Sequence, residues 1–257
     1  MYRKILRDKQ LEAKRETHLE TPAYPGEPDY PDRPSVCFAT LSSGMVTGEL
    51  FSSFVGLWAY DAGHNRYLQE FICKKNGGLL SIYRNQVVTE FLNDTTCDWL
   101  WMVDSDINLE PNTLDLLMDA AQEHPEAQIV SGWYVVPMAQ PEAAVYNWDE
   151  KDRDYHTDPL CGLMEGPRYV DSVGLGNVMV HRDLLIKMYQ LYGLPSPWFH
   201  LKELAATDSH RAHIMGEDHS FFYRTRSDFD QRPLLVPEAH VGHVKSYLLT
   251  KEHLDVV

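Results

Sequence analysis

From Val36 onward, short apolar runs alternate with longer segments whose apolar residues recur at helical spacing. The alternation predicts strands at 36–40, 66–73, 98–103 and 127–136, and helices at 49–60, 79–94 and 110–124. The run DWLWMV at 98–103 is almost entirely apolar, as expected of a strand buried on both faces. Strands that alternate with helices are typical of a mostly parallel sheet covered by helices on both faces, so we expect an α/β fold.

The pattern becomes less regular after Pro137. Residues 140–169 are polar and interrupted by proline and glycine, which predicts irregular strands and a variable loop. Beyond them we expect a strand, a glycine-bearing turn, a second strand and a helix from about Arg182. A further helix is predicted at 216–228 and a late strand at 233–244.

The first 34 residues differ from the rest of the chain. They hold seven basic and seven acidic residues and end in the proline-rich stretch TPAYPGEPDYPDRP, which favours an extended connector. We therefore predict an arm at 1–34 outside one folded domain at 35–257. This domain divides into halves at 35–136 and 137–257.

Composition narrows the class of protein. An apolar fraction of 44% suffices for a sizeable core, and no apolar run approaches the ~20 residues of a membrane-spanning helix. The charged start is unlike a secretory signal, so we expect a soluble, cytoplasmic protein. A net charge of −15 argues against a broad phosphate-binding surface for nucleic acid. The cysteines are widely spaced, which favours reduced, mostly buried thiols over a zinc site at Cys37, Cys73, Cys97 and Cys161.

The candidate chemistry begins at the end of the apolar strand, where the sequence reads DSD. Asp104 and Asp106 lie just beyond the carboxyl end of that strand, the position at which α/β sheets bind ligands. Paired carboxylates suit Mg²⁺ or Mn²⁺, which would also offset the cost of placing two acids together. The motif alone fits equally well a solvated strand end with Asp106 capping the next helix.

Two later motifs carry titratable groups. In HVGHV, His240 and His243 follow the late strand, and an imidazole is an acceptable ligand for Mn²⁺. In GEDHSFFYRTR, Glu217 and Asp218 open a helix, where acids are favoured by the helix dipole. One of these acids is also a candidate general base for an acceptor hydroxyl. Each motif taken singly fits a structural role as well.

A fourth motif is VDSVGLGNVMVHRDLL, in which Gly174 and Gly176 either allow a close approach of backbone to ligand or only form a turn. The order of all four motifs resembles that of nucleotide-sugar-dependent glycosyltransferases of the GT-A fold, especially compact bacterial and bacteriophage members. The resemblance runs from about Val36 to Lys245. It implies a GT-A-like fold, with a mostly parallel twisted sheet flanked by helices, a nucleotide-binding first half and an acceptor-side second half.

The resemblance also implies roles for individual residues. Asp218 would be the catalytic base in an inverting reaction, and Glu217 or Asp218 would only bind hydroxyls in a retaining one. The nucleotide would contact Thr40, Ser42, Ser43, Arg84, Asn85, Asp104 and Ser105. The donor and acceptor cleft would be lined by Trp133, Gly174, Leu175, Gly176 and Asn177. The metal, Mn²⁺ or Mg²⁺, would be held by Asp106 directly, Asp104 directly or through water, and His243, with His240 as the alternative.

The resulting prediction is a metal-dependent glycosyltransferase, a hexosyltransferase that uses a UDP- or GDP-sugar. The acceptor hydroxyl would belong to a modified DNA base such as a hydroxymethylpyrimidine, to a protein or to a glycan, and a phage-encoded enzyme would act in the host cytoplasm. A nucleotidyltransferase is the alternative enzyme, although the loop TLSSGMVTGEL lacks the basic residues typical of that class. A non-catalytic module that binds sugar nucleotides or glycans is the third reading.

Overall fold

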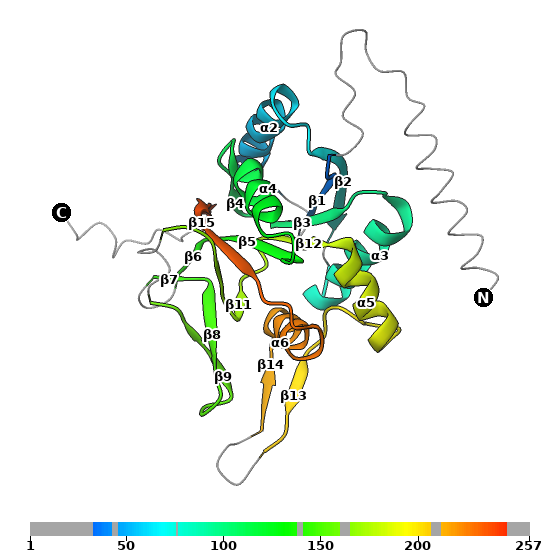
Figure 1. Ribbon diagram of the computed structural model, residues 1–257, viewed down its shortest axis with the longest axis vertical. Coiled ribbons are helices and arrows are strands. Elements are labelled where there is room, and N and C mark those ends of the chain that lie inside the picture. Colours follow the sequence, from blue (N-terminus) through cyan, green and yellow to red (C-terminus); the bar gives the residue numbers. More distant parts are fainter. Residues whose placement is uncertain are drawn as a thin grey trace, which may run out of the picture.

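The computed structural model describes residues 33–42, 46–75, 77–137, 141–159, 165–206 and 212–245. Within these residues, seven strands form a central sheet in the order β10-β15-β5-β12-β3-β1-β2 (Figure 1). Their bounds are β1 Val36–Ser42, β2 Leu68–Lys75, β3 Trp99–Asp104, β5 Ile129–Trp133, β10 Arg168–Tyr169, β12 Asn177–His181 and β15 Leu234–His240. The predicted arm lies outside the described residues except for Arg33 and Pro34.

Most of the sheet is parallel, as predicted. β1 runs parallel to both β2 and β3, and β15 runs parallel to β5. β12 is inserted between β3 and β5 and is antiparallel to both, while β10 pairs antiparallel with β15 at the edge. Because of this reversal, β12 begins where β3 ends, and the N–H of Asp104 donates to the carbonyl of Gly176 at 3.3 Å. The glycine turn and the DSD turn are therefore neighbours in space.

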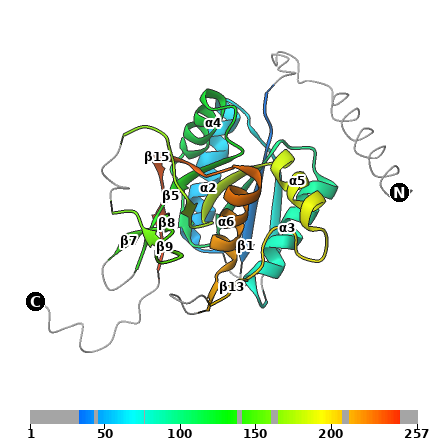
Figure 2. The same cartoon turned by 60° about the horizontal axis from the view of Figure 1, so that its bottom comes forward.

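Helices cover both faces of the sheet (Figure 2). Their bounds are α2 Gly48–Gly63, α3 Leu80–Asp94, α4 Thr113–Glu123, α5 Arg182–Tyr192 and α6 Glu217–Phe229. Side chains of α2 and α4 pack on one face, and those of α3, α5 and α6 pack on the other. The alternation of a strand divides β3 between these two cores: Trp101 and Val103 face α2 and α4, whereas Leu100 and Met102 face α3.

Several predicted boundaries move, and the late strand expected at 233–244 divides into β15 and β16. The helix expected from residue 110 begins at Thr113, since Glu110 and Pro111 lie in a turn closed by Thr113, whose N–H donates to the Glu110 carbonyl at 3.0 Å. The strand expected at 127–136 is divided into β5 and β6 (Val135–Val136), with the buried Tyr134 between them. This interruption turns the chain at the edge of the site described below.

The second half of the chain adds small antiparallel sheets to the central one. β11, β8 and β9 form a three-stranded sheet in that order, β13 pairs with β14, β6 with β7, and β16 with β4. Their bounds are β4 Ile107–Asn108, β7 Glu142–Ala143, β8 Val145–Asp149, β9 Asp154–Thr157, β11 Ser172–Val173, β13 Lys202–Leu204, β14 His213–Met215 and β16 Gly242–His243. The expected irregular strands after Pro137 are thus present.

The cysteines agree in part with the expectation of buried, reduced thiols. Cys37 and Cys97 are buried free thiols, but Cys73 is an exposed free thiol, since it lies on the edge strand β2. Cys161 lies outside the described residues.

Of the helices that the structure describes, none combines the length and the apolar character needed to cross a membrane.

Candidate active site

Three elements meet at Arg84, which α3 places beneath the end of β3. Its Nη2 lies 3.6 Å from Oδ1 of Asp104, and its Nη1 donates to Oε1 of Glu217, at the start of α6, at 2.5 Å. The Arg84 side chain is only 6% exposed, so one buried guanidinium neutralises acids from two other elements. Burial raises the pKa of the Asp104 carboxyl, and the charge of Arg84 opposes that rise.

Asp106 lies in the turn after β3, and the late part of the chain is paired against this turn. β16 is antiparallel to β4, with His243 opposite Ile107, and the N–H of Val244 donates to the carbonyl of Asp106 at 2.7 Å. This pairing brings Nε2 of His243 to 3.3 Å from Oδ2 of Asp106. The other ring nitrogen, Nδ1, lies 2.8 Å from the carbonyl of Val135.

The structure distinguishes between the two histidines. When Nδ1 of His243 donates to a backbone carbonyl, the Nε2 lone pair is directed to Asp106, which is the arrangement of a metal-binding histidine. His240, at the end of β15, is exposed, and its ring lies 6.0 Å from that of Trp133. His243 is therefore the histidine that reaches the acidic turn.

Lys245 also contacts this turn, although no motif in the sequence pointed to it. Its Nζ donates to Oδ2 of Asp106 at 2.6 Å, and its side chain is 35% exposed. The same carboxylate oxygen thus faces both an imidazole nitrogen and an ammonium group.

The residues at the end of β3 fit a divalent cation. The carboxylates of Asp104 and Asp106 and the Nε2 of His243 are donors of the kinds that Mn²⁺ and Mg²⁺ accept, and His243 approaches Asp106 to 3.3 Å, but the three residues do not bring their ligand atoms within 4.8 Å of one another. Among the described residues, the group that does so is Asp149, Asp152 and His156, at the hairpin of β8 and β9. Asp149 there already accepts backbone N–H groups within its own turn.

A small cavity lies beside Arg84, between α3 and the carboxyl ends of β1 and β3. Its wall combines apolar side chains with the two charged groups of the site. It is lined by Ala39, Leu41, Arg84, Val87, Met102, Val103, Asp104 and Leu175. At about 10 Å³ the cavity has room for about one water molecule, so it marks a gap beside the charged pair and not a preformed ligand pocket.

The expected residues of β1 lie on the other face. Thr40 and Ser42 are buried and alternate with Leu41, which lines the cavity. Thr40 therefore points away from Arg84, and its hydroxyl has no hydrogen-bond partner among the described residues. Ser43 lies outside the described residues. Ser105 takes part through its carbonyl, which accepts from the N–H and the hydroxyl of Thr47 at the start of α2.

Two asparagines expected at the site have structural roles instead. The amide of Asn85 is buried, donates to the carbonyl of Phe199 at 2.5 Å, and accepts from the N–H groups of Trp198 and Phe199. Asn177 is fully buried; it accepts from Nε1 of Trp101 at 2.9 Å and donates to a backbone carbonyl of β15 at 3.1 Å. Both amides are buried and bonded to protein groups in this structure.

The glycine turn has a packing role. A Cβ at Gly174 would lie 2.2 Å from the hydroxyl oxygen of Tyr134, and one at Gly176 would lie 2.7 Å from its Cε1. Tyr134, which the sequence did not single out, fills this space, and its ring contacts that of His243 edge-on at 4.9 Å. Burial raises the pKa of its phenol, with the charge of Asp104 as the next cause. The glycines thus support the site through Tyr134.

The acids of α6 differ in their surroundings. Glu217 is held by Arg84, whereas Asp218 is half-buried and forms no ion pair with any described residue. Its Oδ1 accepts from the N–H of His219 at 2.7 Å. Of the two candidate bases, Asp218 is therefore the one whose carboxylate is open to a substrate. Trp133 is anchored apart from both, since its Nε1 donates to the carbonyl of Pro237 at 2.9 Å.

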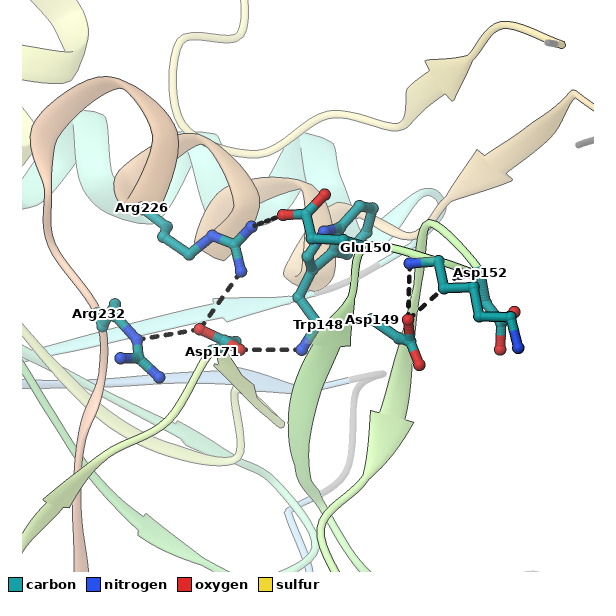
Figure 3. A network of polar contacts seen from close by, with 8 residues as sticks. Trp148, Asp149, Glu150, Asp152, Asp171, Arg226 and Arg232 are labelled. Atoms are coloured by element: carbon teal, nitrogen blue, oxygen red, sulfur yellow. Dashed lines mark hydrogen bonds and ion pairs between the residues drawn. The ribbon is translucent and has the colours of Figure 1, made fainter. Parts of the chain in front are cut away.

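A charged network ties the small sheet to α6 (Figure 3). Oδ1 of Asp171 lies 3.4 Å from Nη1 of Arg226 and 2.9 Å from Nε of Arg232, and its Oδ2 accepts from the N–H of Trp148 at 3.0 Å. Arg226 also pairs with Glu150 at 3.1 Å. Arg226 and Arg232 are thus each paired with a neighbouring acid.

Comparisons with known proteins concern the fold. No family model and no curated protein matches the chain. Among solved structures, A197 from STIV is similar with a TM-score of 0.52 and 17% identity, over 84% of this chain and 97% of that chain. GalNAc-T7, solved with UDP, GalNAc and Mn²⁺, has a TM-score of 0.49 and 12% identity, over 84% of this chain but 45% of that chain. A glycosyltransferase involved in the glycosylation of the major capsid of PBCV-1 has a TM-score of 0.40 and 11% identity, over 83% of this chain and 96% of that chain.

The similarity to A197 agrees with the architecture described above. Most strands of the central sheet run in one direction, one inner strand between β3 and β5 is antiparallel, and helices cover both faces. The DSD turn lies at the carboxyl end of β3, as the motif order led us to expect. The chain has a GT-A-like mixed α/β fold.

Proposed function

We propose that this protein is a metal-dependent glycosyltransferase that moves a hexose from a UDP- or GDP-sugar to an acceptor hydroxyl. One observation carries the proposal: segments far apart in the sequence bring Asp104, Asp106, His243 and the acids of α6 to the same end of β3. Such a set joins a cation-binding group to a candidate base beside a small apolar cavity. A sugar nucleotide needs these three features together.

Each residue has a role in this reaction. A divalent cation, when bound, would neutralise the diphosphate as the bond from sugar to phosphate breaks. Asp218 takes the proton of the acceptor hydroxyl, whose oxygen bonds to the anomeric carbon as the nucleoside diphosphate departs. Arg84 fixes Glu217 and keeps it from repelling Asp104. The nucleotide base would lie beyond the carboxyl ends of β1 and β3, near Leu41 and Leu175, where α/β sheets bind ligands.

The charges around the acceptor half favour a protein or glycan acceptor over a modified DNA base. Arg224 is buried and donates to backbone carbonyls of Pro197 and Trp198. Arg226 is paired with Glu150 and Asp171. A DNA acceptor needs unpaired cations for its phosphates, and neither arginine supplies one. Hydroxymethylpyrimidine DNA stays in the test below as the contrasting acceptor.

The test measures donor binding and turnover together. Thermal shift with a panel of sugar nucleotides, with and without Mn²⁺, should show a metal-dependent stabilisation by one UDP- or GDP-sugar, which binding to the folded state produces. Release of nucleoside diphosphate then measures turnover with glycan, protein and hydroxymethylated DNA acceptors. Stabilisation without turnover on any acceptor would favour the non-catalytic binding module. Turnover of nucleoside triphosphates to pyrophosphate would favour the nucleotidyltransferase.

Two acidic groups serve as matched variants. Asp106→Ala removes a ligand at the end of β3, and Asp152→Ala removes one from the exposed group at the hairpin of β8 and β9. We expect Asp106→Ala to abolish the Mn²⁺-dependent shift and turnover, and Asp152→Ala to leave both unchanged. The reverse pattern would move the metal to the hairpin and remove the basis of the proposal.

A further inference from the structure

The last described segment of the chain is attached to the DSD turn. Gly242 pairs with Asn108 and His243 with Ile107, and the N–H of Val244 extends this pairing to the carbonyl of Asp106. The backbone therefore sets the direction of the two side chains that reach Asp106. His243 and Lys245 are two residues apart on an extended segment, so both point to the same side.

Both side chains meet at one atom. Oδ2 of Asp106 lies 2.6 Å from Nζ of Lys245 and 3.3 Å from Nε2 of His243. A cation bound to this oxygen would lie about 2.0–2.1 Å from it in the case of Mg²⁺, and hence within a few ångströms of the ammonium group. Two positive ions that share one carboxylate oxygen repel each other, so the lysine and the metal compete for Asp106.

The side chain of Lys245 is able to move away when a cation displaces it from Asp106. Its side chain is 35% exposed, and an ammonium on a flexible four-carbon stem can change partners without disturbing the backbone. Arg84 cannot do the same, because it is buried between Asp104 and Glu217. The anion that the proposed function brings to this position is the diphosphate of the donor. An ammonium displaced from Asp106 then has a new partner close at hand.

We propose that Lys245 is a built-in competitor of the divalent cation: it occupies Asp106 in the metal-free protein and transfers to the donor diphosphate when the cation binds. The proposal rests on the proposed function, since it takes the ligand to be a nucleoside diphosphate group. It has two consequences of opposite sign. Removing the ammonium should tighten binding of the metal alone and weaken binding of the nucleotide to the metal-loaded protein.

The test uses Lys245→Met, which keeps the length of the side chain, and Lys245→Arg, which keeps its charge. Calorimetric titration with Mn²⁺ alone should show about tenfold tighter binding by Lys245→Met than by the wild type, from the loss of repulsion at about 4 Å. Titration with UDP and GDP at saturating Mn²⁺ should show several-fold weaker binding by the same variant. Lys245→Arg should resemble the wild type in both. The matched control is Lys187→Met, an exposed lysine of α5 that lies 3.4 Å from Gln128.

The outcomes separate this inference from the proposed function. If Lys245→Met binds Mn²⁺ no more tightly than the wild type while Asp106→Ala loses binding, the competition is refuted and the metal site stands. If Asp106→Ala binds Mn²⁺ as the wild type does, the metal site and the competition both fail. If nucleotide binding at saturating Mn²⁺ is the same in Lys245→Met and the wild type, transfer to the diphosphate is refuted. Equal thermal midpoints for the four lysine proteins would show that folding is not the cause.

Discussion

The buried pair of Arg84 and Glu217 gives the sharpest test of how the site is held together. Arg84→Met removes the cation and leaves Glu217 and Asp104 without their shared partner. The side chains of Arg84 and Glu217 are 6% and 19% exposed, so solvent offers little compensation. Breaking a buried pair by removing one partner costs about 3–5 kcal/mol. We expect Arg84→Met to lower the free energy of unfolding by that amount.

Glu217→Gln should cost less, because Arg84 keeps Asp104 and the new amide oxygen can still accept from Nη1. A hydrogen bond to a charged group contributes about 1.5–3 kcal/mol, and we expect a loss of no more than that. Replacing both residues should be less damaging than Arg84→Met alone, since the unpaired carboxylate of Glu217 is then absent. At about 2–4 °C per kcal/mol for a chain of this size, Arg84→Met should lower the melting temperature by roughly 6–20 °C.

The assay is urea and thermal unfolding in EDTA, with Lys187→Met as the control for loss of an exposed cation. Asp218→Asn is measured alongside, and we expect it to keep the stability of the wild type but to lose sugar transfer. The reasoning would be refuted if Arg84→Met and Glu217→Gln both stayed within about 0.5 kcal/mol of the wild type, the range of ordinary surface substitutions. It would also be refuted if Asp218→Asn retained transfer and only Glu217→Gln lost it.

Three further predictions concern packing and thiol chemistry. Gly174→Ala should lower stability by about 1–3 kcal/mol because its Cβ would lie 2.2 Å from the Tyr134 hydroxyl, and Tyr134→Phe should recover part of that loss in urea unfolding. Asn177→Ala should cost about 2–5 kcal/mol, since it leaves an indole N–H and a backbone carbonyl unpaired in the core, and chemical unfolding measures this loss. Burial raises the pKa of Cys97 to about 12, so its contribution to stability is present below pH 9.0, the ordinary value, and declines as pH rises toward 12. At pH 8 a disulfide reagent should label the exposed Cys73 and not Cys97, as peptide mass spectrometry will show, and labelling of both at equal rates would contradict the buried position.

The regular part of the fold was predictable from local pattern. The helices α2, α3 and α6 begin within one residue of their predicted starts, because the apolar spacing and the flanking polar residues act within a few positions of each other. The direction of β12 was not predictable in the same way. Its apolar run reads the same whether the strand is parallel or antiparallel, and only the three-dimensional course of the chain inserts it between β3 and β5.

In the site, too, residues with a local sequence signal were predictable, and residues brought in by distant pairing were not. Asp104 and Asp106 were predictable because the end of an apolar strand is a local signal. Lys245 carries no such signal, since it reaches Asp106 across 139 positions through the pairing of β16 with β4. Asn85 and Asn177 were predicted to contact ligands, and their bonds to buried protein groups were not predictable for a related reason. A polar residue beside a motif has the same appearance in the sequence whether its amide faces a ligand or a buried backbone group.

The acids at the end of β3 are compensated in two different ways, and the difference bears on how the site would work. Asp104 shares Arg84 with Glu217 in a buried arrangement that no ligand needs to complete. Asp106 faces an exposed lysine that a cation can replace. The buried pair of Arg84 and Glu217 thus holds the start of α6, and with it Asp218, in place. At Asp106, a cation can replace the ammonium of Lys245 without moving the candidate base. A site divided in this way can bind and release a charged donor in each cycle while its proton acceptor stays in place.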